Sequence, residues 1–327
     1  MPMLTDQFGR KITYLRVSVT DRCNLRCRYC MPAAGVPPKR HEDLLTFEEI
    51  AAVVAAGASF GITKVRLTGG EPLLRRGAVD LVRLLAAVPG VADLALTTNG
   101  LLLARHAAEL KAAGLMRVNV SLDTLRADRF AAMTGSDDWR GVMAGIDAAL
   151  AAGFAPVKLN VVAIRGYNDD EVADFVRFAR DKGLHLRFIE FMPVGNSFWE
   201  PGKVIPTKEV RALAERAAAL VPAQNGNAGD VAELCQMPGS AATVGFISPL
   251  SAKFCRRCNR LRLTADGFLK PCLACKNEID IKVPVRRGLR GDELKRVFFE
   301  AMRLKPRAHS MEEGAAESPR CMAEVGG

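Results

Sequence analysis

Three closely spaced cysteines near the start of the chain form the first candidate reactive site. Their spacing is Cys23-x3-Cys27-x2-Cys30, and they follow directly on a β-branched run that predicts a strand. Three thiolates can hold three irons of a [4Fe–4S] cube and leave the fourth iron open to a small molecule. Structural zinc is the alternative, but a closed zinc site needs four ligands, and His41 is the nearest further candidate. We therefore expect a cluster with one open iron.

A second cysteine group lies much further along the chain. It reads Cys255-x2-Cys258-x13-Cys272-x2-Cys275, which is close to the paired-cysteine pattern of a zinc ribbon. A basic zinc ribbon would also suit nucleic-acid binding. The spacing alone therefore leaves both zinc and iron–sulfur ligation open.

Composition limits the classes of protein to which the chain can belong. The 327 residues are 49% hydrophobic and 25% charged, which is typical of a soluble globular protein. Residues 1–10 contain no apolar run, and apolar stretches such as residues 79–88 are too short for a bilayer, so we expect a cytoplasmic protein. Disulfides are disfavoured there, so nine cysteines indicate metal or redox chemistry. The net charge of +10 is spread along the chain and does not identify a partner.

Short β-branched runs alternate with longer Ala/Leu-rich stretches from about residue 12 to residue 192. The predicted strands are 12–20, 64–68, 94–98, 117–122, 157–164 and 185–191. Amphipathic helices are predicted between them, for example at 47–56, 78–87 and 170–182. Glycines precede five of the strands, namely Gly61, Gly90, Gly114, Gly153 and Gly183. Glycine there suits the left-handed turn that ends a helix.

Six such strand–helix units predict an α/β fold with a parallel sheet and right-handed crossovers. A closed eightfold barrel needs about 250 residues, whereas these six units take fewer than 200. We therefore predict an open, partial βα barrel, with a doubly wound sheet as the alternative. In either fold, function gathers at the C-terminal ends of the strands.

The alternation of strands and helices ends after Met192. Prolines and glycines over residues 193–206 mark a connector to a predicted helix at 208–220. We place a domain boundary near residue 215. The partial barrel then occupies residues 1–215, and a C-terminal iron–sulfur domain in residues 216–327 completes the mouth of the barrel.

The first cysteine group resembles the signature of the radical SAM superfamily, C-x3-C-x2-C at the end of the first strand of a βα barrel. The run T-G-G-E-P at residues 68–72 resembles the motif with which that superfamily grips the methionine amino group of S-adenosylmethionine (SAM). The resemblance implies that the open iron binds SAM and that one electron cleaves it to methionine and a 5′-deoxyadenosyl radical. The cofactor then carries the hard chemistry, and the protein orients it.

The second cysteine group resembles the C-terminal motif of the molybdenum cofactor biosynthesis protein A family, the GTP 3′,8-cyclases. The resemblance covers nearly the whole chain, through runs such as V-R-L-T-G-G-E-P-L-L-R, V-N-V-S-L-D-T and F-I-E-F-M-P-V-G. It implies that Cys255, Cys258 and Cys272 hold a second [4Fe–4S] cluster whose open iron contacts the guanine of GTP. Cys275 is extra to the family pattern, and we expect a free thiol. Cys235 departs from the aromatic residues more often found there, and we expect a buried or free thiol.

The same motifs imply which residues bind the substrate and SAM. The triphosphate of GTP needs fixed cations, and arginine suits bidentate phosphate recognition. The expected GTP-binding residues are Arg16, Arg66, Thr97, Lys158, Arg260 and Arg262, with Arg16 also placed as the catalytic residue. The expected SAM-binding residues are Tyr29, Gly70, Ser121 and Met192. The chain ends in Gly-Gly, and in this family the tail threads into the barrel.

The implied reaction is a rearrangement of GTP, in which the radical takes hydrogen from ribose C3′ and the carbon radical attacks C8 of guanine. Reduction of the resulting aminyl radical gives 3′,8-cyclo-7,8-dihydro-GTP, which completes the first step of molybdopterin (molybdenum cofactor) biosynthesis. Expected cofactors are two [4Fe–4S] clusters and SAM. Expected partners are a reductant protein such as a flavodoxin or ferredoxin, a downstream cyclic pyranopterin monophosphate synthase and a second copy of the chain, with no nucleic acid or membrane.

Two alternative functions stay open. One is another radical SAM enzyme with an auxiliary cluster, for example a peptide-modifying one. The other is a basic zinc-ribbon protein that binds nucleic acid and has no enzymatic role. The run Asn259-Arg260-Leu261-Arg262 and the Gly-Gly end favour the cyclase over both.

Overall fold

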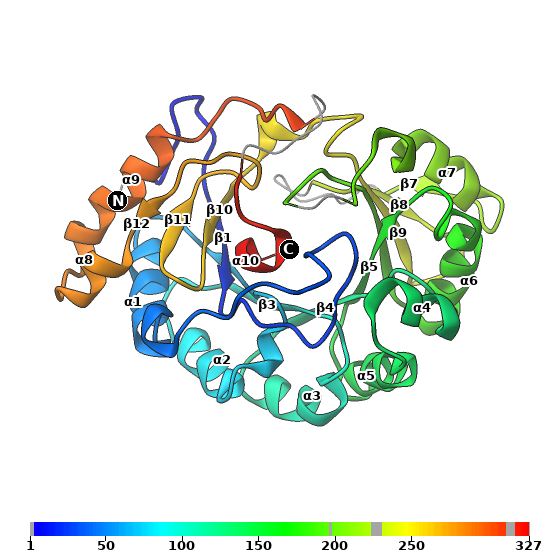
Figure 1. Cartoon of the computed structure of the whole chain (residues 1–327), viewed down its shortest axis with the longest axis horizontal. Helices are drawn as coiled ribbons and strands as arrows, with labels where there is room; N and C mark the ends of the chain where they lie inside the picture. Colours follow the sequence, from blue (N-terminus) through cyan, green and yellow to red (C-terminus); the bar gives the residue numbers. More distant parts are fainter. Residues whose placement is uncertain (1–2, 196–197, 224–230, 312–317, 327) are drawn as a thin grey trace.

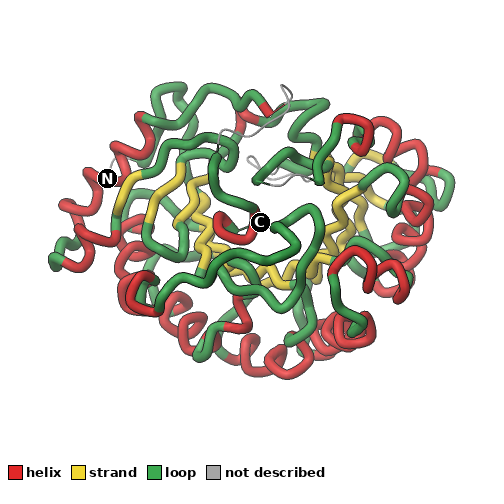
Figure 2. The backbone as a smooth tube through the Cα atoms, viewed as in Figure 1, coloured by secondary structure: helices red, strands yellow, loops and turns green. Residues whose placement is uncertain are grey.

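The sheet of this protein curves into an open arch with helices on its convex side. A computed structural model describes residues 3–195, 198–223, 231–311 and 318–326. Among them, twelve strands form one sheet in the order β12-β11-β10-β1-β2-β3-β4-β5-β6-β9-β8-β7. The strands line the inside of the arch, and most helices lie outside it (Figures 1 and 2). This arrangement confirms the predicted α/β partial barrel.

The six predicted strands are all present and pair in parallel with their neighbours along the chain. They are β1 (Tyr14–Ser18), β2 (Lys64–Thr68), β3 (Asp93–Thr98), β4 (Arg117–Ser121), β5 (Val157–Ala163) and β6 (His185–Glu190). The first predicted strand was too long at both ends, since β1 covers residues 14–18 rather than 12–20. Each strand therefore brings its C-terminal end to the same rim of the arch.

The C-terminal third of the chain extends this sheet at both edges. Strand β9 (Thr243–Ile247) is parallel to β6, and β10 (Arg260–Leu263) is parallel to β1. Short antiparallel strands follow at the two edges, namely β7 (Val221–Pro222), β8 (Glu233–Gln236), β11 (Phe268–Lys270) and β12 (Ile279–Asp280). One sheet thus runs through both predicted domains, and the boundary near residue 215 stays a prediction.

Helices pack against the outer face of the sheet. The α-helices are α1 (Phe47–Ala58), α2 (Ala78–Ala86), α3 (Leu103–Ala112), α4 (Ala127–Thr134), α5 (Trp139–Ala151), α6 (Val172–Lys182), α7 (Thr207–Glu215), α8 (Lys282–Arg286), α9 (Gly291–Arg303) and α10 (Met322–Val325). The short 3-10 helices are η1 (His41–Asp43), η2 (Pro72–Leu74), η3 (Asp169–Glu171), η4 (Pro201–Lys203) and η5 (Cys255–Arg257). The four predicted helices are confirmed as α1, α2, α6 and α7, although α7 ends at residue 215 rather than 220. No helix in the described ranges is long and apolar enough to cross a membrane.

Local sequence signals explain where these helices begin and end. Helix α1 starts with a capping box. The Thr46 side chain accepts a hydrogen bond from the backbone N–H of Glu49, and the Glu49 side chain accepts one from the backbone N–H of Thr46. The five glycines predicted to precede strands all have positive φ angles, from 69° to 108°. A side chain is strained in that conformation, so glycine is the residue that lets the chain turn from helix to strand.

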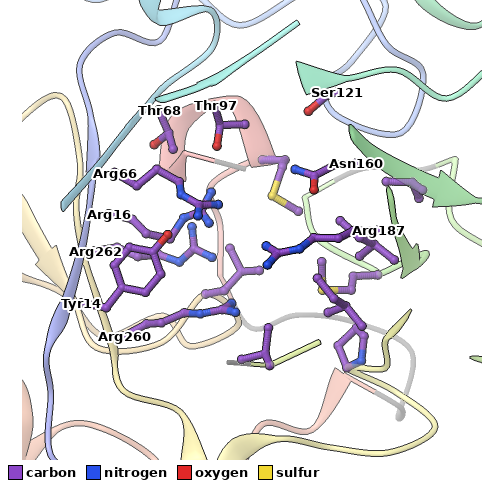
Figure 3. A pocket seen from close by; sticks show the side chains of 18 of the residues that line it. Tyr14, Arg16, Arg66, Thr68, Thr97, Ser121, Asn160, Arg187, Arg260 and Arg262 are labelled. Atoms are coloured by element: carbon purple, nitrogen blue, oxygen red, sulfur yellow. The ribbon is translucent and has the colours of Figure 1, made fainter. Parts of the chain in front are cut away.

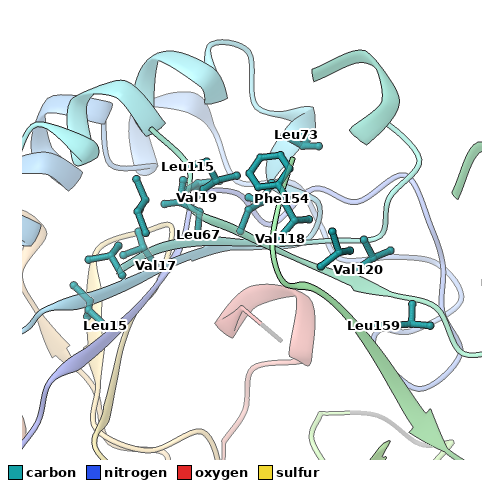
Figure 4. Packing of buried hydrophobic residues seen from close by; sticks show 14 of the residues in the cluster. Leu15, Val17, Val19, Leu67, Leu73, Leu115, Val118, Val120, Phe154 and Leu159 are labelled. Atoms are coloured by element: carbon teal, nitrogen blue, oxygen red, sulfur yellow. The ribbon is translucent and has the colours of Figure 1, made fainter. Parts of the chain in front are cut away.

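The hydrophobic core fills the space between the sheet and the outer helices. Alternate residues of a strand point to opposite faces, so in β1 Leu15 and Val17 are fully buried on the outer side. Figure 4 shows them beside Leu67 and Val118 from neighbouring strands. The intervening residues of each strand face the inside of the arch. This alternation decides which strand residues can reach a bound ligand.

Candidate active site

The concave side of the sheet holds a cavity of about 810 Å³. It is lined by both cysteine groups, by residues of β1 to β6 and β10, and by Met322 of α10. Every residue predicted to bind a cluster, SAM or GTP is among those that line it. Figure 3 shows side chains from several strands pointing into this space. The fold thus brings the predicted set together, and the role of each residue stays a prediction.

The first cysteine triad, Cys23, Cys27 and Cys30, lies on the loop after β1. The Sγ atom of Cys23 accepts weak hydrogen bonds from the Leu25 backbone N–H at 3.5 Å and from the Asn99 amide at 3.9 Å. Burial raises the pKa of all three thiols. Three partly buried thiolates need positive charge beside them, and the irons of a cluster would supply it. The loop therefore fits a metal cluster.

The glycine pair after β2 holds this cysteine loop in place. The Gly70 N–H donates to the Thr20 carbonyl at 2.8 Å, and a Cβ on Gly70 would lie 2.2 Å from the Arg22 carbonyl oxygen. Gly69 is equally crowded, since its Cβ would lie 2.6 Å from the Thr20 carbonyl oxygen. The chain's own loop just before the first cysteine thus approaches both glycines closely. Both also line the cavity, and the SAM contact expected at Gly70 stays a prediction.

The second triad comes from two segments. Cys255 and Cys258 lie in and after η5, and Cys272 follows β11. Although burial opposes it, the nearby Lys305 and Arg260 hold the pKa of Cys258 below its ordinary value. Burial raises the pKa of Cys255. Cys258 of this triad therefore has fixed cations beside it, which favour a bound thiolate.

The fourth cysteine of the second group is not part of the cavity lining. Cys275 is buried, is not among the residues that line the cavity, and its S–H donates to the Cys272 carbonyl at 3.5 Å. A hydrogen bond from the Cys275 thiol lowers the pKa of Cys272. Both features match the expected free thiol beside a ligand. Cys235 is also buried and free, and its sulfur accepts from Arg211 at 3.3 Å.

Neither cysteine group is arranged around a point where one metal ion could sit. Over the described ranges, no set of three or more Cys, His, Asp or Glu side chains converges on a single ion site. A zinc ribbon needs such convergence of four ligands. In an iron–sulfur cube each cysteine binds a different iron, so the sulfurs can lie further apart.

Arginines from three neighbouring strands form the most highly charged wall of the cavity. Arg16 of β1 is in register with Arg66 of β2 and with Arg262 of β10. All three are buried, and burial lowers the pKa of each guanidinium. For Arg262, burial and the neighbouring charge of Arg260 together lower the pKa to about 10. Like charges directly opposite one another in a sheet destabilise it. A polyanionic ligand would relieve that repulsion (Figure 3).

Several polar atoms at this wall have no hydrogen-bond partner among the described residues. They include Oγ1 of Thr97 and Nε of both Arg66 and Arg260. Buried polar groups are almost always paired, so unsatisfied donors aimed at a cavity indicate a ligand with acceptor atoms. Lys158 of β5 is also buried and lines the cavity. The donors fit phosphate groups.

The residues predicted to bind SAM lie near the first triad and at the strand ends. Tyr29 donates its hydroxyl proton to Asp123 at 2.6 Å. Burial raises the pKa of Asp123 to about 6, and hydrogen bonds from Tyr29 and the Val162 backbone oppose a larger rise. Ser121 ends β4, and Met192 follows β6 by two residues. All four predicted SAM residues line the cavity, and Met192 packs against the same apolar cluster as Cys272 of the second triad.

The C-terminal tail enters the arch and contacts the arginine wall. Helix α10 lies inside the curve of the sheet (Figure 1), and the Gly326 carbonyl accepts hydrogen bonds from Arg16, at 3.3 Å, and from Arg262. Gly326 has φ 73°, and a Cβ there would lie 2.0 Å from the Thr68 hydroxyl oxygen. Glycine is therefore required at this position, both by its conformation and by the space. Gly327 lies outside the described residues.

Comparison with known proteins agrees with this geometry. Residues 17–179 match the family described as the Radical SAM superfamily, and residues 184–311 match the one described as Molybdenum Cofactor Synthesis C. The GTP 3′,8-cyclase of Moorella thermoacetica is 52% identical over 99% of this chain and 100% of its own length. That of Pelotomaculum thermopropionicum is 50% identical with the same coverage. The chain belongs to the GTP 3′,8-cyclase family.

More distant solved structures share the fold. Streptococcus suis SuiB bound to S-adenosylmethionine matches with a TM-score of 0.59 at 14% identity. The match covers 80% of this chain and 60% of SuiB, so the chain spans less than two thirds of that structure. At this identity the match supports the radical SAM fold of the family and says nothing about its substrate.

Some cavity residues of this family member escaped sequence reasoning. Arg187 of β6 is buried, lines the cavity and is in register with Asn160 of β5. Asp123 and Tyr14 also line it. The alternation of strand residues could have found Arg187, since its neighbours Leu186 and Phe188 are core residues and it must therefore face inward. No local signal marked Asp123 as the partner of a tyrosine so far away in the sequence.

Proposed function

We propose that this chain is a GTP 3′,8-cyclase, which uses SAM to convert GTP to 3′,8-cyclo-7,8-dihydro-GTP in the first step of molybdenum cofactor biosynthesis. One observation carries the proposal: two cysteine triads and a wall of buried arginines share a single cavity. Its cofactors are two [4Fe–4S] clusters and SAM, as in the family to which it belongs.

The first triad and its neighbours are proposed to handle SAM. When bound there, the cluster and SAM supply a 5′-deoxyadenosyl radical. Tyr29, fixed by its hydrogen bond to Asp123, and the backbone at Gly70 orient SAM, with Ser121 and Met192 on the facing strand ends. Enclosure of the cavity excludes water, which protects a reactive radical from side reactions.

The arginine wall and the second triad are proposed to hold GTP between them. Arg16, Arg66 and Arg262 bind the triphosphate as bidentate donors, joined by the other predicted cations, Lys158 and Arg260. The second triad, Cys255, Cys258 and Cys272, holds the cluster that contacts the guanine. Thr97 adds a hydroxyl whose oxygen has no partner in the described part of the chain. Arg16 is proposed as the catalytic residue, and its contact with the tail carbonyl of Gly326 holds its guanidinium in the cavity.

The test uses the full chain, reconstituted anaerobically with iron and sulfide. Iron and sulfide contents should approach ~8 each, the ~4 per cube expected of two cubes. Formation of 5′-deoxyadenosine from SAM and reductant should rise when GTP is added. A nucleoside triphosphate that lacks the C8 attack site should not give a cyclised product.

Two results would overturn this function. Zinc in place of iron at the second group would support the zinc-ribbon alternative. Turnover of SAM that is indifferent to GTP, with both clusters present, would support another radical SAM enzyme. Either result can be read directly by metal analysis and product analysis.

The remaining roles concern the setting of the enzyme. We propose that it works in the cytoplasm with a reductant protein such as a flavodoxin or ferredoxin, because each turnover consumes two electrons, one to cleave SAM and one to reduce the radical left after the attack on C8. The product would pass to a cyclic pyranopterin monophosphate synthase. A homodimer is part of the same proposal, and size-exclusion chromatography of the reconstituted protein tests it.

A further inference from the structure

A buried lysine connects the two segments that carry the second cysteine triad. Lys305 follows α9 and is 2% exposed. Its ammonium donates to the Arg260 carbonyl at 2.8 Å, to the Pro271 carbonyl at 2.6 Å and to the Cys258 sulfur at 3.8 Å. An ammonium has three N–H donors, so these three acceptors use all of them.

The two carbonyls belong to residues that flank the proposed ligands. Arg260 follows Cys258 by two residues, and Pro271 immediately precedes Cys272. Lys305 therefore ties together two ligand segments that the cysteine spacing separates by thirteen residues. None of its acceptors is a carboxylate, so its charge is solvated but not neutralised. Burying a charge in that condition is costly unless a further negative group lies beside it.

A cluster held by thiolates is that negative group. A cube with three cysteine ligands carries net negative charge, and reduction adds one electron to it. A fixed cation beside the cluster, with an N–H donated to a ligand sulfur, stabilises the reduced state more than the oxidised state. Net charge and hydrogen bonds to the sulfurs are among the factors that set cluster potentials.

The first triad has a cation in a different position. The Arg26 guanidinium donates to the backbone carbonyls of Cys23 and Leu25, at 2.7 and 3.0 Å, rather than to a sulfur. The described hydrogen-bond donors to the Cys23 sulfur are the Leu25 backbone and the Asn99 amide, both neutral. The second triad thus differs from the first in having a buried cation that donates to a ligand sulfur.

We propose that Lys305 is a positioning residue that fixes the two ligand segments of the second cluster and raises its reduction potential above that of the first. The proposal rests on the proposed ligand set of Cys255, Cys258 and Cys272. It predicts that electrons settle on the second cluster, beside the substrate, before the first. Removal of the charge without loss of side-chain volume should reduce or reverse the difference between the two reduction potentials.

The test compares two buried lysines by redox titration followed with electron paramagnetic resonance. Lys305→Met keeps a similar length and removes the charge. It is made in a chain whose first triad is replaced by alanine, so that the second cluster is titrated alone. We expect the ratio of reduced to oxidised second cluster at a fixed potential to fall at least tenfold, which is 59 mV for a one-electron couple.

Lys270→Met is the matched control. Lys270 is fully buried in the neighbouring hairpin, but its ammonium donates to the Cys275 carbonyl at 2.8 Å and lies 3.6 Å from the Glu278 carboxylate. Its charge is therefore already neutralised, and it contacts no ligand sulfur in the described structure. Its loss should leave the potential of the second cluster unchanged. An equal shift in both variants would overturn the proposal, as would no shift in Lys305→Met.

A further variant covers the case in which Lys305→Met loses the second cluster. Lys305→Gln retains an N–H donor without the charge, and its cluster is then titrated in the same way. A wild-type potential in Lys305→Gln, or loss of the cluster from both variants, would count against an electrostatic role. Cys258→Ala separates this inference from the proposed function: if it keeps the second cluster, the ligand set itself is wrong.

Discussion

The two cysteine triads are built in different ways although they face the same cavity. The first lies on one continuous loop after β1, within eight residues of sequence. The second is assembled from η5 and the end of β11, with Lys305 from a third segment between them. Neutral groups donate to the Cys23 sulfur of the first, whereas the buried ammonium of Lys305 donates to the Cys258 sulfur of the second. A contiguous motif thus defines its own chemistry, whereas an assembled one depends on residues that only the fold brings close.

The difference suits two tasks. A cluster that must give an electron to SAM benefits from surroundings that do not stabilise the reduced state. A cluster that binds a polyanionic nucleotide benefits from nearby positive charge, which the arginine wall continues toward β1 and β2. The same cations that would hold the substrate therefore also act on the cluster beside it. Substitutions at each triad can test whether the two tasks are really separate.

The largest effect is expected from removing one triad at a time. Cys23→Ala should abolish 5′-deoxyadenosine formation altogether, because SAM then has no cluster to bind. Cys255→Ala should keep about half of the iron and still cleave SAM slowly, but form no cyclised product from GTP. Iron analysis and chromatography of the nucleoside products measure both. Loss of all SAM cleavage in Cys255→Ala would show that the triads do not act separately.

The next effect concerns the arginine wall beside the second triad. Arg262→Ala should weaken GTP binding by roughly 10- to 100-fold, since a hydrogen bond to a charged group contributes about 1.5–3 kcal/mol. SAM binding, which depends on the other side of the cavity, should change little. Anaerobic equilibrium dialysis with GTP and with SAM separates the two affinities.

Two control variants sharpen that measurement. Arg165→Ala removes an exposed arginine that pairs with Glu209 at 2.7 Å, far from the cavity lining, and should leave both affinities unchanged. Arg262→Lys keeps the charge but not the bidentate geometry, so it should recover part of the lost affinity. Equal loss of GTP and SAM binding in Arg262→Ala would instead indicate general damage to the cavity.

The contrast between the triads also explains what sequence reasoning could reach. Strands β2 and β4, the helix-ending glycines and the first triad depend on neighbours in sequence, and all were predicted at or near their positions. Attachment of β9 to β6 and of β10 to β1 was not, because paired residues that lie 58 positions apart (His185 and Thr243) or 246 positions apart (Tyr14 and Arg260) leave no local pattern. Lys305 and Asp123 were missed for the same reason. Their roles arise from contacts that the folded sheet creates.

A smaller, pH-dependent effect is expected at the first triad. Burial raises the pKa of Asp123 from its ordinary value of 3.8 to about 6. The folded state therefore favours the protonated acid, and this stabilising contribution is fully present below pH 3.8 and is lost as the pH rises through about 6. Relative to Asp123→Asn, the wild type should lose at most about 3 kcal/mol of stability across that range. Urea unfolding of both proteins at several pH values measures the difference.

The affinity for SAM should also depend on the protonation of Asp123, but with the opposite sign: it should rise, not fall, as the pH increases. The ionised carboxylate of Asp123 accepts a stronger hydrogen bond from Tyr29 than the protonated acid does. Wild-type affinity for SAM should therefore fall by roughly fivefold, about 1 kcal/mol, as the pH drops below 6. The asparagine variant should show the lower affinity at every pH. A parallel pH dependence in both proteins would assign the effect to another group.

The smallest effect is expected at the fourth cysteine of the second group. Cys275 is buried, does not line the cavity and has its thiol turned to the carbonyls of Cys272 and Asn277. Cys275→Ala should therefore keep all eight irons expected of two cubes and nearly full cyclase activity, whereas Cys272→Ala should lose the second cluster. The two substituted cysteines lie three positions apart in the same turn. Equal loss of iron from both variants would therefore show that Cys275 is a ligand. The second site would then be closed by protein, and its open iron could not contact the guanine of GTP.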